Sequence, residues 1–304
     1  MSDKQVVFAV PSTTLPSTVY VGSNVTIDGT ANGMNGVTLD QPADQARALV
    51  IEDPASNIVI KGINFRSTAT PNQSAPEFDL LALDGTNGAS ISKVLVDRCT
   101  FVRATDGALD ITGNVSDVSV QRSLFYGTAK TMLIKYLTRK NLSIHHNVFT
   151  HNGERNPQAK GDLKLLDFVN NVLYLEDVPA YPDGTVTSPY GTRVFSCGTG
   201  CDSPGDVTAN LVNNAYLGDG AQIDLLTGPG GGSNAGVFIA GNLCVPASNC
   251  PASPAGAANA IPAAYAVTAL GTAELEPMLL PYVGAPNRTP LDQQYIDEVA
   301  AALP

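Results

Sequence analysis

Basic residues and long apolar runs are scarce in this 304-residue sequence, and each scarcity argues against a class of protein. Lysine and arginine number 17 against 28 aspartates and glutamates, so the formal net charge is -11 and the sequence pI is about 4.6. Nucleic-acid binding depends on neutralising phosphates with Lys and Arg, so we expect no nucleic-acid partner. No apolar stretch reaches the length that spans a bilayer, so we expect no membrane insertion either.

Cysteine is also sparse, with five residues in the chain. Cys197 and Cys201 bracket a Gly-Thr-Gly turn, and Cys244 and Cys250 bracket the segment VPASN. Both pairs have the spacing of small loop disulfides, which would indicate an oxidising compartment. Cys99 is left over, and we interpret it as a buried structural thiol. A CxxxC zinc site is the competing interpretation, but no second Cys or His pair has ligand-like spacing.

What the sequence does contain is a 24-residue repeat. Phe101, Phe125, Phe149 and Leu173 stand at this spacing, and each ends a short strand-like run. A fixed period of this size is typical of a solenoid, in which successive coils stack and bury a shared core. Residues one period apart are therefore predicted to lie on neighbouring coils, at about the 4.8 Å spacing of paired strands.

A column of small and amide side chains precedes these positions by two residues. The column, continued in a looser register towards the C-terminus, consists of Cys99, Ser123, Asn147, Asn171, Asn214 and Asn242. Stacked asparagines suit the corner of a parallel coil because each amide both donates and accepts a hydrogen bond. Leucine-rich repeats have a similar length, but they need leucines at fixed offsets and a helical return, whereas the returns here contain further short strands. The sequence therefore predicts an all-β fold, a right-handed parallel β-helix.

The repeat runs through the middle of the chain without a linker, which predicts one β-helix domain over residues 1–304. Upstream, VVFAV, TVYV and NVTIDG predict three more short strands. The longer step between Phe65 and Phe101 leaves room for an insertion around TATPNQSAPEF. The C-terminal LDQQYIDEVAAALP predicts a helix within about residues 285–304, packed over or beside the end of the stack, where it shields an exposed edge. We expect the protein to be a monomer.

Charged residues follow the same period. Asp106, Lys130 and Arg155 lie five or six residues after the phenylalanine of their own repeat, so stacking would bring an acid and two cations together. Asp97 and Asp110 belong to the coil of Asp106, which makes three carboxylates in one coil and its turn. Oxygen ligands on a flexible turn suit Ca²⁺. The alternative is that these charges are ordinary cross-strand ion pairs on a solvated face.

Several consecutive segments resemble a known family. The succession VLVDRCTF, DGALDI, VSVQRSLFYGTAKTMLI, LSIHHNVFTHNGERNPQAK and VNNVLY is similar to the pectate lyase superfamily of polysaccharide lyase family 1, the pectate lyase C-like enzymes. The family order is a DGxxDI turn, a KTMLIG strand, HHNxF, RxPxxR and a closing NN. The similarity is continuous from about Asn57 to Tyr174.

The resemblance implies roles for individual residues. Asp97, Asp106 and Asp110 match the family's Ca²⁺ ligands. Lys130 matches its substrate-binding lysine, which takes part in catalysis, and Arg155 matches its catalytic arginine.

Two lysines depart from the family pattern. Lys160 stands where a second arginine is usual, and Lys135 replaces a glycine. A lysine keeps the positive charge but lacks the planar fork of arginine, so Lys160 is expected to hold a substrate carboxylate in a less fixed orientation.

The implied activity is calcium-dependent β-elimination on polygalacturonate or a related acidic polysaccharide, by a secreted enzyme whose signal peptide is not present in MSDKQ. One alternative is a non-catalytic carbohydrate-binding or adhesion module, and others are a lyase on another uronic acid polymer or a hydrolase with paired carboxylates. His145, His146 and His151 fall in one coil. Since neighbours in a strand point to opposite faces, we expect them to pack and hydrogen-bond rather than to share a metal ion.

Overall fold

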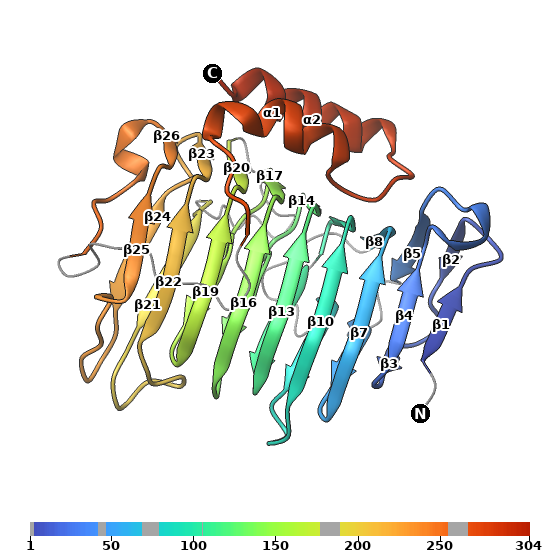
Figure 1. Ribbon diagram of the computed structural model, residues 1–304, viewed down its shortest axis with the longest axis horizontal. Coiled ribbons are helices and arrows are strands. Elements are labelled where there is room, and N and C mark those ends of the chain that lie inside the picture. Colours follow the sequence, from blue (N-terminus) through green and yellow to red (C-terminus); the bar gives the residue numbers. More distant parts are fainter. Residues whose placement is uncertain (1–2, 42–46, 69–78, 105, 177–188, 255–266) are drawn as a thin grey trace.

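The computed structural model describes residues 3–41, 47–68, 79–104, 106–176, 189–254 and 267–304, and it forms a stack of coils (Figure 1). Successive coils add strands to three sheets, and strands from neighbouring coils pair in parallel. The architecture is the right-handed parallel β-helix that the repeat predicts. The insertion around TATPNQSAPEF falls largely outside the described residues.

The three sheets are called sheet A, sheet B and sheet C. Sheet A consists of β1 (Lys4–Val7), β4 (Val25–Asp28), β7 (Ala55–Lys61), β10 (Ile91–Asp97), β13 (Val115–Gln121), β16 (Arg139–His145), β19 (Leu163–Val169), β22 (Val207–Val212) and β25 (Val237–Ala240). Sheet B consists of β2 (Ser12–Thr14), β5 (Val37–Gln41), β8 (Ile63–Ser67), β11 (Thr100–Val102), β14 (Leu124–Tyr126), β17 (Val148–Thr150), β20 (Val172–Tyr174), β23 (Ala215–Leu217) and β26 (Leu243–Val245). Sheet C consists of β3 (Val19–Val21), β6 (Arg47–Glu52), β9 (Asp79–Gly85), β12 (Leu109–Gly113), β15 (Leu133–Lys135), β18 (Gln158–Lys160), β21 (Thr192–Ser196) and β24 (Ile223–Thr227).

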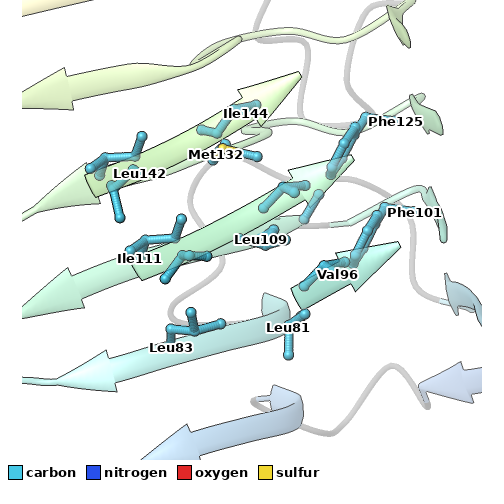
Figure 2. Packing of buried hydrophobic residues seen from close by; sticks show 14 of the residues in the cluster. Leu81, Leu83, Val96, Phe101, Leu109, Ile111, Phe125, Met132, Leu142 and Ile144 are labelled. Carbon is cyan, nitrogen blue, oxygen red and sulfur yellow. The ribbon is translucent and has the colours of Figure 1, made fainter. Parts of the chain in front are cut away.

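The 24-residue period sets the register of the core. Phe101 pairs with Phe125, and Phe125 with Phe149, and their rings stack with centroids 4.7 and 4.8 Å apart. Phe65 joins the same stack, with its centroid 5.1 Å from that of Phe101. Figure 2 shows Phe101 and Phe125 one above the other, with aliphatic side chains from the facing strands around them. Burial of this shared interior supplies the main stabilising free energy of the coils.

The polar column forms the ladder that the sequence predicts. Asn147 Nδ2 donates to Asn171 Oδ1 at 3.0 Å, and Asn171 Nδ2 donates to Asn214 Oδ1 at 3.1 Å. Asn214 continues the ladder to Asn242, and Ser123 N donates to Asn147 Oδ1 at 2.9 Å. Each amide also donates to a backbone carbonyl of an earlier coil, so these buried groups are satisfied and hold the corner between sheets A and B.

The residue before each ladder position has a positive φ, which turns the chain from sheet A into sheet B. The φ angle is 47° at Arg98, 49° at Arg122 and 55° at His146. Residues other than glycine seldom adopt this left-handed conformation. Because this conformation recurs at the same place in successive coils, it is a structural feature of the corner. The alternation of inward and outward side chains along the sheet A strand stops at this residue.

The C-terminal helix is present, but it covers a face of the solenoid rather than an end. Helix α2 spans Pro290–Ala302, begins after the N-cap Thr289, and follows the short helix α1 (Leu275–Leu279). Short 3₁₀ helices lie at Ala31–Gly33, Ala247–Asn249, Thr272–Glu274 and Leu280–Tyr282. Figure 1 shows α1 and α2 along the outside of sheet B. Apolar side chains on both sides explain the position: Leu124, Val148, Val172, Leu275, Ile296 and Val299 form one buried cluster.

The cysteines behave differently from one another. Cys244 and Cys250 lie together as a close pair, with Cα atoms 6.0 Å apart. Cys197 and Cys201 are free thiols, so the structure does not join the second predicted pair. Cys99 is fully buried in the core, and burial raises the pKa of its thiol to about 12, as expected for a structural thiol. In the described part of the chain, no helix has the length and apolarity needed to cross a membrane.

Candidate active site

Two buried carboxylates meet at the start of neighbouring strands of sheet C. Asp79 begins β9 and accepts a hydrogen bond from Gly107 N at 3.0 Å, while Asp110 in β12 accepts one from Leu133 N at 3.0 Å. Position 107 has no room for a side chain, because a Cβ atom would lie 2.5 Å from Asp79 Oδ1 and 2.6 Å from Asp110 Oδ1. Glycine in DGALD therefore lets both oxygens converge above the backbone.

The convergence leaves negative charge that the protein only partly offsets. Burial, followed by the charges of Asp110 and Asp106, raises the pKa of Asp79 well above its usual range. Burial also raises the pKa of Asp110 to about 6, against the opposing effect of Arg155. Arg47 approaches from β6, with its Nε 3.3 Å from Asp79 Oδ2. Carboxylates in this state are stabilised by any further positive charge placed between them.

The predicted acid and cations do come together beside this pair. Lys130 Nζ lies 2.8 Å from Asp106 Oδ1, and the backbone of Lys130 bridges Gly107 on one coil and Glu154 on the next. Arg155 follows Glu154, and its charge acts on Asp110. Arg155 has a φ of 64°, and its buried Nε atom has no hydrogen-bond partner among the described residues. The group thus combines three carboxylates with Lys130 and Arg155 over four successive coils.

The structure does not bring Asp97 into this group. Asp97 ends β10 in sheet A, and the whole of β11 in sheet B lies between it and the turn that carries Asp106. Its carboxylate accepts from Arg122 Nε at 2.9 Å and from Gln121 Nε2 at 3.1 Å. The third carboxylate beside Asp106 and Asp110 is Asp79. Asp79 was not among the residues predicted from the sequence, because the insertion before β9 interrupts the repeat.

Lys160 lies on the same sheet but has its own acidic partner. It ends β18, and its Nζ is 2.6 Å from Asp202 Oδ1. Asp202 belongs to the turn after β21 and also pairs with Lys135 at the end of β15. Sequence spacing gave no sign of this contact, because the loop that carries Asp202 is outside the uninterrupted repeat.

The donor chemistry of the carboxylates fits a hard divalent cation. Asp79, Asp106 and Asp110 offer only oxygen atoms, which Ca²⁺ prefers. Burial, with a smaller contribution from the neighbouring carboxylates, raises the pKa of Asp79 and Asp110, and a bound cation would offset this cost of holding their charge. Within the described ranges, no group of three or more His, Cys, Asp or Glu side chains is already arranged as a metal site. The ion pair of Asp106 with Lys130 is consistent with this, because it turns one carboxylate towards a lysine.

A cavity of about 950 Å³ lies away from this group, along the outer face of sheet A. It is lined by residues of β4, β7, β10, β13 and β16, including Ser119, Gln121 and His145, and by Leu270 and Met278 from the C-terminal segment. The site is assigned to sheet C rather than to this cavity, because the carboxylates, Lys130 and Arg155 are concentrated there.

His145 and His146 do not point to opposite faces, as strand alternation predicted. His145 Nδ1 and His146 Nδ1 lie 2.9 Å apart, since the left-handed corner at His146 ends the strand alternation that should separate them. His145 Nε2 is also 3.3 Å from Ser119 Oγ. His151 contacts Thr150, Tyr295 and Glu298 beneath α2. All three therefore pack and hydrogen-bond.

The burial of His145 predicts a pH dependence of stability. Burial lowers the pKa of His145 from 6.5 to about 4; the charges of His146 and Arg122 act in the same direction, and Asp97 opposes them. The unfolded chain then binds more protons between pH 6.5 and 4, so this contribution to stability is present above pH 6.5 and lost as pH falls. In urea unfolding, His145→Gln should reduce the loss of unfolding free energy across this range by about 1–2 kcal/mol. An unchanged pH slope would contradict the prediction.

Comparison with solved structures defines the class of this fold. The major allergen of cedar pollen matches with a TM-score of 0.64 and 13% identity, over 92% of this chain and 80% of that chain. A thermostable pectate lyase matches with a TM-score of 0.57 and 16% identity, over 90% of this chain and 70% of that chain. A pectate lyase from a Bacillus species, in complex with trigalacturonate, matches with a TM-score of 0.52 and 15% identity, over 88% and 85%.

The chain is a right-handed parallel β-helix with acidic and basic side chains gathered on one sheet. More specifically, it shares the fold of solved pectate lyases, and this is the fold that the sequence resemblance implied. No protein-family model and no curated protein sequence matches it. At identities of 13–16%, the similarity to the structures above supports the fold alone. The activity has to be inferred from the residues of the site.

Proposed function

We propose that this protein is a calcium-dependent pectate lyase that cleaves polygalacturonate by β-elimination. The observation that carries the proposal is the convergence of Asp79 and Asp110 next to Lys130 and Arg155 on sheet C. Elimination on a uronate needs a cationic environment for the carboxylate and a group that removes the neighbouring proton, and this arrangement offers both.

The carboxylates are proposed to hold the metal ion. Asp79 and Asp110 would provide the fixed ligands, because backbone N–H groups already orient their oxygens. Asp106, which now lies 2.8 Å from Lys130 Nζ, would join them by turning from Lys130 towards the metal ion. Calcium, when bound, would supply positive charge where carbanion-like charge develops on the substrate carboxyl group.

Arg155 is proposed to take the proton from C5 of the sugar. A double bond forms between C4 and C5 as the bond from C4 to the leaving oxygen breaks, and water supplies the proton that this oxygen takes up. Arginine in proteins is normally protonated, so this role requires a guanidinium that can give up a proton before the reaction. Its buried, unpartnered Nε supports the role, since the side chain is not already saturated by hydrogen bonds. Lys130 would bind the carboxyl group of the same sugar and stabilise the charge that forms there.

The negative net charge of the chain is compatible with an anionic substrate. A polyanion meets the local cations Lys130, Arg155 and Lys160, and the acidic cluster would meet it through the metal ion. Global charge then mainly affects solubility. A secreted location is proposed together with this substrate, and the close Cys244 and Cys250 pair would suit an oxidising compartment.

The test is the chemical nature of the product. The protein incubated with polygalacturonate and Ca²⁺ should release oligogalacturonides with an unsaturated end, which absorb in the ultraviolet and are lighter by one water than hydrolysis products. Saturated products would instead indicate a hydrolase, and binding without turnover would indicate a carbohydrate-binding module. Either result would refute the lyase proposal.

A further inference from the structure

Two lysines on adjacent strands share a single carboxylate at the edge of the proposed site. Lys135 ends β15, Lys160 ends β18, and both ammonium groups contact Asp202, the second with its Nζ 2.6 Å from Asp202 Oδ1. Lys135 Nζ also lies 4.4 Å from the ring centroid of Tyr136, and Lys160 Nζ lies 5.0 Å from that of Phe195. Two cations over aromatic rings thus hold one carboxylate by both of its oxygens.

The cluster keeps surplus positive charge. One carboxylate offsets only one of the two lysines, and their hydrogen bonds lower the pKa of Asp202 to about 2. Burial by itself would lower the pKa of Lys135, but its hydrogen bonds to Asp202 and Tyr136 give a net increase. Two ammonium groups thus face a single carboxylate, which leaves room for a second carboxylate to bind between them.

The lysines are on the face of sheet C that carries Asp110. Lys135 pairs with Thr112 in the sheet register. Thr112 lies two residues after Asp110 in β12, which is roughly 7 Å along a strand, and the two side chains are on the same face. A chain of uronate residues that reaches the carboxylate pair would therefore pass close to Lys135 and Lys160.

Asp202 is placed so that its side chain can leave without unfolding its loop. The Asp202 side chain is 52% exposed, whereas those of Lys135 and Lys160 are 13% and 18% exposed. The neighbouring Ser203 is buried and anchors the loop, because its Oγ donates to Lys160 O at 3.2 Å and accepts from Tyr136 N at 3.2 Å. Rotation about the side-chain bonds of Asp202 is enough to free both ammonium groups.

We propose that Lys135 joins Lys160, for which the sequence resemblance already implies a substrate contact, in one carboxylate-binding subsite, and that Asp202 fills this subsite as an internal substitute until a uronate displaces it. This subsite rests on the proposed function for the choice of a uronate ligand. It adds Lys135 and Asp202 to the residues that recognise substrate. The Asp202 carboxylate would compete with any ligand for the two lysines, so weakly charged ligands would bind poorly.

The subsite is tested by measuring trigalacturonate binding calorimetrically in the full chain with Ca²⁺, in an Arg155→Ala background to limit turnover. Asp202→Asn removes the competing charge and should tighten binding roughly three- to tenfold. Adding Lys135→Gln to that variant should abolish the gain. Fully methyl-esterified trigalacturonate, which lacks the carboxylates, should show no gain in either case.

Asp219→Asn is the matched control, because Asp219 is an exposed acid and its replacement changes the net charge equally. Equal tightening by Asp219→Asn, or unchanged or weaker binding by a folded Asp202→Asn, would overturn the subsite. Thermal unfolding confirms that each variant is folded, and Lys135→Gln alone, expected to weaken binding, tests the same claim if Asp202→Asn is unstable. Tighter binding by Asp202→Asn without unsaturated product from the unmodified protein would refute the lyase and retain the subsite. The converse would retain the lyase and refute the subsite.

Discussion

Arg155→Ala is expected to lower kcat on polygalacturonate by about 10²- to 10⁴-fold, the range that a positioned proton-transfer group contributes. The loss should appear mainly in kcat rather than in KM, since Lys130 and the carboxylates that bind the uronate remain in place. Initial rates of ultraviolet-absorbing product give both constants. Thermal unfolding of the variant checks that the loss of rate does not come from loss of the fold.

Arg122→Ala provides the matched control for this loss. Arg122 is paired with Asp97 on the far side of β11, and its side chain is 43% exposed. Arg122→Ala removes one arginine from the β-helix but leaves the site on sheet C unchanged. The rate should therefore stay within about twofold of that of the unmodified protein. An Arg155→Ala protein that keeps its full rate would show that another group takes the proton.

Asp79→Asn is expected to weaken calcium binding by at least about tenfold, the lower end of the effect of removing a group that supports a bound metal ion. The same change should leave the calcium-free protein at least as stable at neutral pH. Its carboxylate has a raised pKa because of burial and the neighbouring charges of Asp110 and Asp106. A raised pKa favours folding at low pH and opposes it as pH rises, so a neutral amide removes that penalty. Calorimetric titration and thermal unfolding with and without Ca²⁺ measure the two effects.

Asp97→Asn separates this prediction from the one that the sequence alone made. Asp97 was predicted as a metal ligand, but it accepts hydrogen bonds from Arg122 and Gln121 at the end of sheet A. Its replacement should reduce stability through loss of these contacts and leave calcium affinity unchanged. Loss of calcium binding in Asp97→Asn, with binding preserved in Asp79→Asn, would contradict the assignment of Asp79 as a ligand.

The part of the site inside uninterrupted coils could be predicted from the sequence. The constant period aligned Phe101 with Phe125 and brought Asp106 within 2.8 Å of Lys130. Asp79 could not be found in this way, because the insertion between Phe65 and Phe101 shifts the count. Only the pairing of Leu81 with Leu109 places Asp79 opposite Gly107. That alignment depends on the strand register, and the register cannot be counted from the sequence across an insertion.

Contacts made across long sequence separations were equally hidden. Asp202 reaches Lys135 and Lys160 from a loop after β21, and no periodic spacing connects these residues. The helix α2 was predicted from its apolar pattern, but its place over sheet B depends on outward-facing residues such as Leu124 and Val148. The alternation of side chains along a strand assigns such residues to the inner or the outer face only when the positions of the corners are known.

The most direct test is the rate of unsaturated product formation from polygalacturonate at buffered free calcium concentrations. We expect no product with excess chelator and a saturable increase of the rate with calcium. The curve should shift to higher calcium concentrations in Asp79→Asn but not in Asp97→Asn. A rate that is independent of calcium, or no unsaturated product at any calcium concentration, would contradict the proposed function.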